Sequence, residues 1–142
     1  MSEPKEVLEF LNAKEEELNE IMGQAADLLG FELHIPGRLP SELEPSLLLY
    51  VKRAKVLRDR IEKLERQTRV LIKYLRDSCI SGLEWRINPI MLQSVVDLLT
   101  QLKAAVNYLE QTNKKMVELV DRIYDYKIKL NFNSPAPFYE RR

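Results

Sequence analysis

The chain has 142 residues, of which 45% are hydrophobic, 31% are charged and only four are glycine. This length suits a single domain, and the apolar content excludes a chain that is disordered over most of its length. Lys and Arg number 22, as do Asp and Glu, so the chain lacks the basic excess that is typical of nucleic-acid binders. Abundant Leu, Glu, Lys and Arg are typical of long solvent-exposed helices, because straight side chains lose little freedom there.

The single cysteine, Cys79, excludes an internal disulfide and favours a reducing compartment. No apolar stretch approaches the roughly 18 residues that a membrane-spanning helix needs. The first residues are charged and lack the apolar core of a signal peptide. We therefore expect a cytoplasmic or nuclear protein without a membrane span.

The apolar spacing of the N-terminal part predicts a helix over residues 3–29. Gly30 stands directly after it, where helices commonly end with a glycine in the left-handed conformation. Lys14 interrupts an otherwise apolar seam. The seam consists of Val7, Leu11, Leu18, Ile21, Ala25 and Leu28.

A proline-containing segment, residues 31–45, separates the first helix from the second, which we place over residues 46–79. Ser41 and Glu44 have the spacing of a capping box, although the helix could equally begin at Pro45. Its seam residues alternate at spacings of three and four with mostly polar residues between them, which is typical of a coiled coil. The seam consists of Leu47, Tyr50, Ala54, Leu57, Ile61, Leu64, Thr68, Leu71, Leu75 and Ser78.

The third predicted helix, residues 89–130, is the longest. Because only residues 80–88 connect it to the second helix, we expect the two helices to fold back as an antiparallel hairpin. Its seam consists of Leu92, Val95, Leu99, Leu102, Val106, Leu109, Asn113, Met116, Val120, Ile123, Lys127 and Leu130. A further row widens the apolar stripe enough to contact more than one helix, and consists of Met91, Leu98, Ala105, Leu119 and Tyr126.

These patterns predict an all-α fold with two parts. Residues 1–130 form an elongated helical bundle in which the second and third helices are an antiparallel coiled-coil hairpin. Residues 131–142 form a short extended tail, because Pro135 and Pro137 prevent the last helix from continuing.

Charge is divided between the first two helices. Residues 3–29 contain eight acidic and two basic residues, whereas residues 47–79 contain ten basic and four acidic ones. Opposite charges predict that these helices lie side by side or meet across a dimer. The alternative is that the basic helix binds a polyanion, but its basic residues are not confined to one face and no aromatic residues alternate with them. We therefore expect partner helices in preference to nucleic acid.

No set of residues indicates catalysis, a metal site or a cofactor site. His34 and Cys79 are the only histidine and cysteine, so a metal site or a Cys/His nucleophile has no complete set of ligands or partners. The four glycines are scattered and form no phosphate-binding loop.

The stretch LRDRIEKLERQTRVLIKYL, residues 57–75, resembles the first helix of the helical chorismate mutases. That resemblance implies a dicarboxylate site lined by arginines and lysines that point between helices. In this chain the seam of the second helix is apolar apart from Thr68 and Ser78. The seam of the third helix offers only Asn113 and Lys127. The basic set that such a pocket needs is missing.

Five residues are candidates for binding a partner. Asn113 selects register or oligomer state if it meets a polar group across the core, and otherwise lies at the periphery of the bundle. Trp85, in the second connection, either caps the core or anchors a partner. Phe132, Phe138 and Tyr139 in the tail would bury their rings on a partner or on the end of the bundle.

We expect a non-catalytic scaffold or adaptor subunit that binds other helical proteins, as a hetero-complex or a homo-oligomer, with no cofactor and no small-molecule substrate. Comparable subunits occur in cytoskeletal, spindle, kinetochore and vesicle-tethering complexes, which is an analogy of architecture. A dedicated chaperone for an export-bound or filament-forming helical partner is the alternative. An enzyme similar to the chorismate mutases is a distant third.

Overall fold

The structure is a computed structural model that describes residues 4–35, 41–80 and 89–130, with side chains as far as residue 125 in the last of these ranges. Three helices follow one another: α1 (Pro4–Leu29), α2 (Glu44–Ile80) and α3 (Pro89–Leu130). Of the described residues 92% are helical and none forms a strand, which confirms the predicted all-α fold. The contact between α2 and α3 is the most extensive in the molecule, as expected for a helical hairpin.

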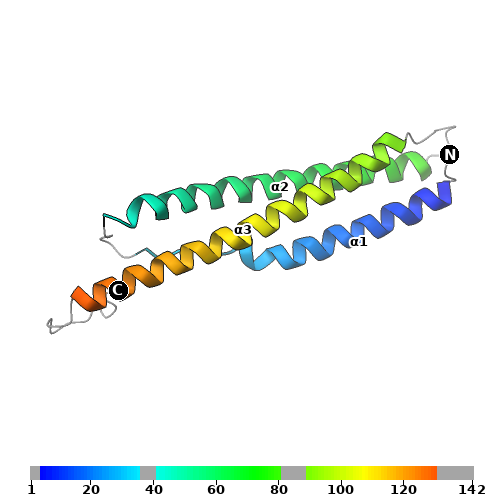
Figure 1. The fold of residues 1–142 in the computed structure, drawn as a ribbon. Coiled ribbons are helices and arrows are strands. Elements are labelled where there is room, and N and C mark those ends of the chain that lie inside the picture. Colours follow the sequence, from blue (N-terminus) through cyan, green and yellow to red (C-terminus); the bar gives the residue numbers. More distant parts are fainter. Residues whose placement is uncertain (1–3, 36–40, 81–88, 131–142) are drawn as a thin grey trace.

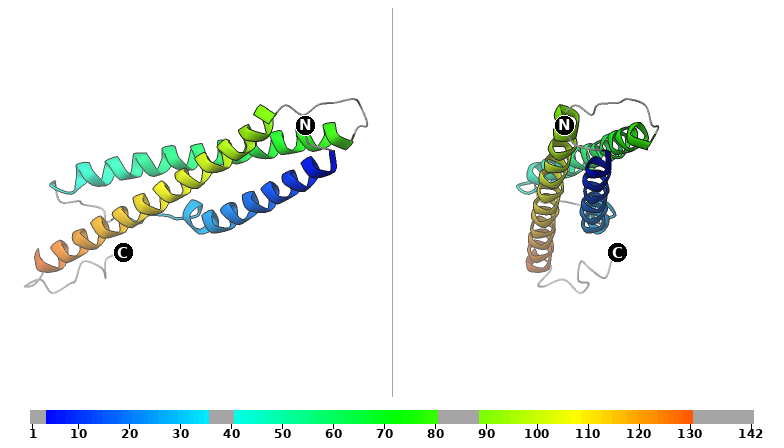
Figure 2. Two further views of the ribbon diagram at one scale, coloured as in Figure 1. Left: turned by 45° about the vertical axis from the view of Figure 1, so that its right-hand side comes forward. Right: turned by 90° about the vertical axis from the view of Figure 1, so that its right-hand side faces the viewer.

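The three helices lie along one another in an elongated bundle (Figure 1). α2 runs antiparallel to both α1 and α3, and the two further views show α1 packed beside the hairpin of α2 and α3 (Figure 2). A helix with the 42 residues of α3 is about 63 Å long. α3 continues beyond the end of α1, so the bundle has three helices over only part of its length.

The predicted seams of the three helices meet in one hydrophobic core. Every predicted seam residue whose side chain is described is buried or half-buried. Ile72 is also buried although it lies off the predicted seam of α2. Thr68, a polar seam residue, is fully buried and its hydroxyl donates to the Leu64 carbonyl oxygen at 2.6 Å. The largest fully buried side chains are Leu11, Leu18, Leu47, Ile61, Ile72, Leu75, Leu99, Leu102, Leu109, Met116, Ile123 and Val95.

The helix ends differ from the prediction at three places, one of which is the end of α2 at Ile80, one residue later than predicted. α2 begins at Glu44, two residues early, and the Leu47 amide already donates to the Leu43 carbonyl at 3.0 Å. The prediction of a left-handed Gly30 is wrong, because its φ lies outside that region. The Gly30 amide instead continues the helical pattern by donating to Ala26 O at 3.1 Å. The chain leaves α1 through a tighter turn, in which the Phe31 amide reaches back three residues.

The acidic α1 and the basic α2 lie side by side in the same chain, which is one of the two arrangements that their charges predicted. Arg76 donates to Asn12 Oδ1 at 3.1 Å and pairs with Glu15 at 2.5 Å. Seven residues earlier in α2, Arg69 donates to Asn19 Oδ1 at 3.1 Å, seven residues later in α1. The two sets of bonds follow opposite sequence directions along the two helices, which fixes the antiparallel register of α1 on α2.

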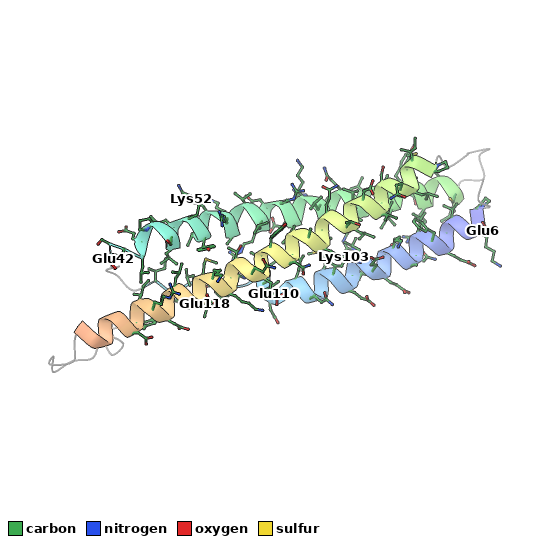
Figure 3. The ribbon with its side chains drawn as sticks, in the orientation of Figure 1. Glu6, Glu42, Lys52, Lys103, Glu110 and Glu118 are labelled. Atoms are coloured by element: carbon green, nitrogen blue, oxygen red, sulfur yellow. The ribbon has the colours of Figure 1, made fainter. Side chains whose placement is uncertain are left out.

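Glu17 attaches α1 to α3 on its other flank. The ammonium group of Lys103, which lies on α3 (Figure 3), contacts Glu17 Oε1 at 2.5 Å. This hydrogen bond holds the pKa of the Glu17 carboxyl below its ordinary value, and Lys14 acts in the same direction, while partial burial opposes both. Lys14 interrupts the seam without burying its charge, because its amine lies over the Phe10 ring and pairs with Glu17 at 3.1 Å.

Candidate interaction surface

Of the five residues predicted to bind a partner, Trp85, Phe132, Phe138 and Tyr139 lie outside the described residues. Asn113 is described and is 5% exposed. It therefore lies in the core and not at the periphery, and its role toward a partner stays a prediction.

Asn113 meets the last turn of α1. Its amide nitrogen donates to the Leu28 carbonyl oxygen at 3.3 Å, while its Oδ1 is buried without a hydrogen-bond partner in the described structure. The last carbonyls of a helix have no partner within the helix. The Leu28 carbonyl accepts a long bond from the Phe31 amide, at 3.4 Å, and the Asn113 amide is its second donor. Just beyond, Arg58 of α2 donates to the Phe31 carbonyl oxygen. α3 and α2 thus each hold the backbone where α1 ends.

His34 and Cys79 lie far apart. His34 is exposed and lines a hollow together with Ala54 and Arg58 of α2, whereas Cys79 lies at the opposite end of α2. Burial raises the pKa of the Cys79 thiol, which disfavours the reactive thiolate. Among the described residues, no group of three or more His, Cys, Asp or Glu could hold a metal ion. No described helix is both long and apolar enough to cross a bilayer.

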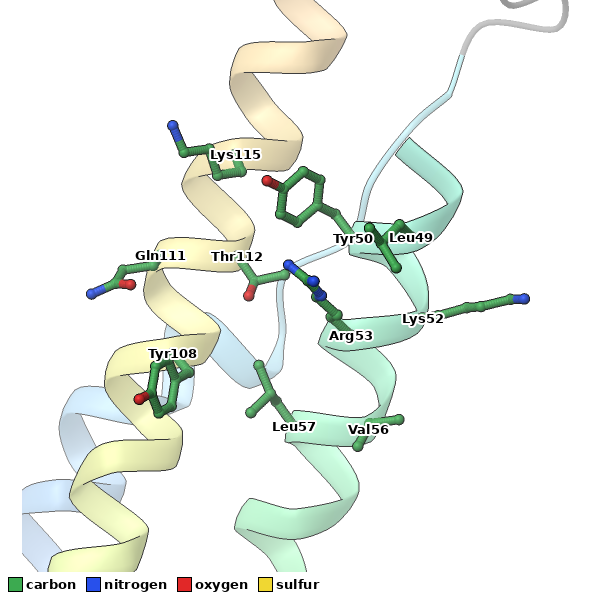
Figure 4. Close-up of a pocket in the computed structure, with 10 residues that line it drawn as sticks. All are labelled: Leu49, Tyr50, Lys52, Arg53, Val56, Leu57, Tyr108, Gln111, Thr112 and Lys115. Atoms are coloured by element: carbon green, nitrogen blue, oxygen red, sulfur yellow. The ribbon is translucent and has the colours of Figure 1, made fainter. Parts of the chain in front are cut away.

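A hollow of the described surface lies between the N-terminal half of α2 and the middle of α3, and we call it the α2–α3 groove. Its volume is about 680 Å³. Figure 4 shows its walls, with α2 on one side and α3 on the other. It is lined by Leu49, Tyr50, Lys52, Arg53, Val56, Leu57, Tyr108, Gln111, Thr112 and Lys115.

The floor of the α2–α3 groove is mainly apolar, and exposed apolar side chains lie beside it. Tyr50 and Leu57 are half-buried and form part of the predicted seam. Leu49, Val56 and Tyr108 are 48%, 65% and 61% exposed, although such side chains usually lie in the core. Contiguous exposed apolar side chains of this kind mark binding sites more often than scattered ones do.

The charged residues that line the α2–α3 groove are all basic. Lys52 and Arg53 stand on α2, and Lys115 stands on α3, where it pairs with Glu118 at 3.3 Å. The Arg53 guanidinium lies 5.5 Å from the centre of the Tyr50 ring and points across toward α3 (Figure 4). The groove therefore offers an apolar floor between two basic rims.

The α2–α3 groove lies on the side of the hairpin away from α1. The side chains of the hairpin that form hydrogen bonds or ion pairs with α1 are Arg69 and Arg76 on α2 and Lys103 and Asn113 on α3, and none of them lines the groove. One turn beyond Leu57, Arg60 donates to Gln101 at 3.3 Å across the two helices. This bond lies just beyond the end of the groove that is lined by Leu57 and Tyr108.

The sequence prediction missed Leu49, Val56 and Tyr108 as surface candidates. A signal was present in α2, because Leu49 and Val56 are apolar, lie off the predicted seam and are seven residues apart. Residues seven apart in a helix share a face. Which face stays open depends on where α1 packs, and that is a tertiary property.

No protein-family model, no curated protein and no solved structure matches the chain. Function has to be inferred from the fold and from this surface.

Proposed function

We propose that this protein is a non-catalytic scaffold or adaptor subunit that binds other proteins through coiled-coil-type helix packing. The observation that carries the proposal is the α2–α3 groove, where Leu49, Val56 and Tyr108 remain about half exposed or more on a hairpin whose other side is filled by α1. A groove between two long helices is a common site for a partner helix. The proposed setting is the cytoplasm or nucleus, in an assembly of the cytoskeletal, spindle, kinetochore or vesicle-tethering type.

The polar groups inside the bundle support a structural role for the core. Thr68 and Asn113, two buried polar residues of the seams, both donate to backbone carbonyl oxygens. These donors stabilise helices of the same chain and do not converge on a common cavity. The resemblance to the chorismate mutases required a basic pocket between the helices, and the described core contains no buried arginine or lysine.

The test is to express the tagged full chain in its native source, cross-link it and compare its partners with those of two variants. Val56→Asp places a charge in the α2–α3 groove, and Val70→Asp places one at an equally exposed position of α2 outside it (65% and 69% exposed). We expect Val56→Asp to lose specific partners that Val70→Asp retains. Identical partner sets for the wild type and both variants would contradict the proposal.

A chaperone that keeps a helical partner soluble is the second candidate. The observation that favours it is the closed core, since Leu11, Leu18, Ile61 and Leu102 are fully buried without any partner chain. A protein with such a core is expected to be stable alone and to bind reversibly. A chase experiment separates the two functions: assembly of the partner displaces a chaperone, whereas an adaptor stays bound in the finished assembly.

A further inference from the structure

We propose that the partner of the α2–α3 groove is an acidic amphipathic helix, which docks its apolar face between Lys52 and Arg53 on one rim and Lys115 on the other. This inference rests on the proposed function and specifies the chemistry of the partner.

The molecule itself contains an example of this recognition on the other side of the same hairpin. α1 contains seven acidic and two basic residues between Pro4 and Leu29. Its apolar seam packs on the hairpin, and it is flanked by Arg69 and Arg76 from α2 and Lys103 from α3. The hairpin therefore holds an acidic helix between two arginines on one helix and a lysine on the other.

The α2–α3 groove repeats this arrangement, and no helix of the described chain covers it. It also has two basic residues on α2 and one lysine on α3, and no acidic residue lines it. In Figure 3, Lys52 projects from α2 on the side away from α1. Along α2 the lining runs from Leu49 to Leu57, which is about 12 Å or two turns of helix. Apolar residues spaced three and four apart on a partner helix would reach this floor, and carboxylates beside them would reach both rims.

A second copy of this chain is the competing occupant. If two copies met through the α2–α3 grooves about a twofold axis, identical surfaces would face each other, and the basic rims would approach basic rims. Like charges at such an interface are unfavourable. Charge complementarity therefore favours a different, acidic helix over self-association through the groove.

The test uses a displayed library of amphipathic helical peptides as the probe. The apolar heptad positions are fixed as Leu, and the flanking positions vary among Glu, Lys, Gln and Ser. The full chain serves as the bait, and affinities of the selected peptides are measured by fluorescence anisotropy at low and moderate salt. We expect the selected peptides to be enriched in Glu, and their binding to weaken as salt rises.

Two pairs of variants locate the binding. Val56→Ser with Tyr108→Ser should weaken the selected peptides by about tenfold or more, while Val70→Ser with Val117→Ser should change binding less than about twofold. Lys52→Gln, Arg53→Gln and Lys115→Gln together should weaken binding and reduce its salt dependence. The matched triple Lys63→Gln, Arg66→Gln and Lys73→Gln has the same change in charge at exposed positions outside the groove, and should have a smaller effect.

Several results would overturn the inference. These are selected peptides that are neutral or basic, no selected peptide at all, or equal effects of the two charge triples. Self-association of the wild type in analytical ultracentrifugation that Val56→Ser abolishes would show that a second copy occupies the groove. If native partners depend on Val56 but show no preference for acidic helices, the proposed function stands and only this inference fails.

Discussion

The two sides of the α2–α3 hairpin differ in whether a helix covers them. On one side α1 buries its seam, so that Leu11 and Leu18 are inaccessible to solvent. On the other side, nearer the start of α2, Leu49 and Val56 remain 48% and 65% exposed. Both sides have an apolar floor and basic rims. The comparison teaches that the same two helices bury one face under α1 and leave a chemically similar face exposed, where we propose that a partner binds.

The largest expected effect is on stability, and it separates the two sides directly. Leu18→Ala removes a fully buried side chain under α1 and should lower the free energy of unfolding by about 3 kcal/mol. Leu49→Ala makes the same chemical change in the α2–α3 groove, where the side chain is 48% exposed, and should change it by less than about 0.5 kcal/mol. Urea denaturation followed by circular dichroism measures both. Similar losses for the two variants would mean that the groove is closed in solution.

Asn113→Leu tests the attachment of α1 at its end. Leucine removes a buried Oδ1 that has no partner and adds apolar contact, so we expect the melting temperature to rise, with a gain of about 1 kcal/mol. The bond to Leu28 O is lost, so the position of α1 should become less uniform. Spin labels at the exposed positions Gln24 and Lys114 report this as a broader distance distribution. An unchanged distribution would mean that the amide does not position α1.

Glu17→Gln should have a smaller effect that depends on pH. Because the pKa of Glu17 is lowered on folding, its carboxylate contributes stability above the ordinary value of 4.5 and loses that contribution as the pH falls through the lowered value. We expect a loss of about 0.5 kcal/mol at pH 7, since the pair is partly exposed, and no difference from the wild type in strong acid. Urea denaturation across this pH range provides the measurement. A difference that persists unchanged into acid would contradict the assignment.

Deletion of residues 132–142 should affect stability least. The tail contains prolines and aromatic residues but no pattern that builds a core, so helicity and melting temperature should stay nearly unchanged. We expect weaker binding to at least one partner, reproduced largely by Phe138→Ala with Tyr139→Ala. Measuring partner affinity for the deletion with and without Val56→Ser shows whether the tail and the groove bind the same partner. A melting temperature several degrees lower with intact affinity would make the tail structural.

The helices were predictable because their signals are local and repeated. The seams of α1, α2 and α3 could be identified from spacing alone, and the division of charge correctly predicted the pairing of α1 with α2. Ile72 was missed because seam residues spaced alternately three and four apart form a narrow stripe that contacts one helix, whereas α2 packs on both α3 and α1. Ile72 lies on the helix face between Arg69 and Arg76, which both bond to α1, so Ile72 also faces α1. Gly30 was assigned wrongly because residue type indicates a permitted conformation and does not require it.

The interaction surface was less predictable than the fold. Tyr50 and Leu57 belong to the seam by spacing, yet they also form the floor of the α2–α3 groove. Whether Leu49, Val56 and Tyr108 are covered depends on which face of the hairpin α1 occupies and on where α1 ends. That choice is made by a few contacts between distant residues, such as Lys103 with Glu17, which no spacing rule within one helix contains.

The bond from Asn113 to the end of α1 distinguishes between alignments that the apolar seam alone would leave nearly equal. Leu11, Leu18 and Ala25 are seven residues apart, so a shift of α1 by about 10 Å would again place apolar residues against the hairpin. If α1 were shifted so that its interior lay beside Asn113, the side-chain amide of Asn113 would face carbonyl oxygens that already accept bonds within the helix. A buried donor without an acceptor costs about 1–3 kcal/mol. The observed alignment is therefore favoured at the last turn of α1, where the Leu28 carbonyl accepts only the long bond from the Phe31 amide and has room for a second donor.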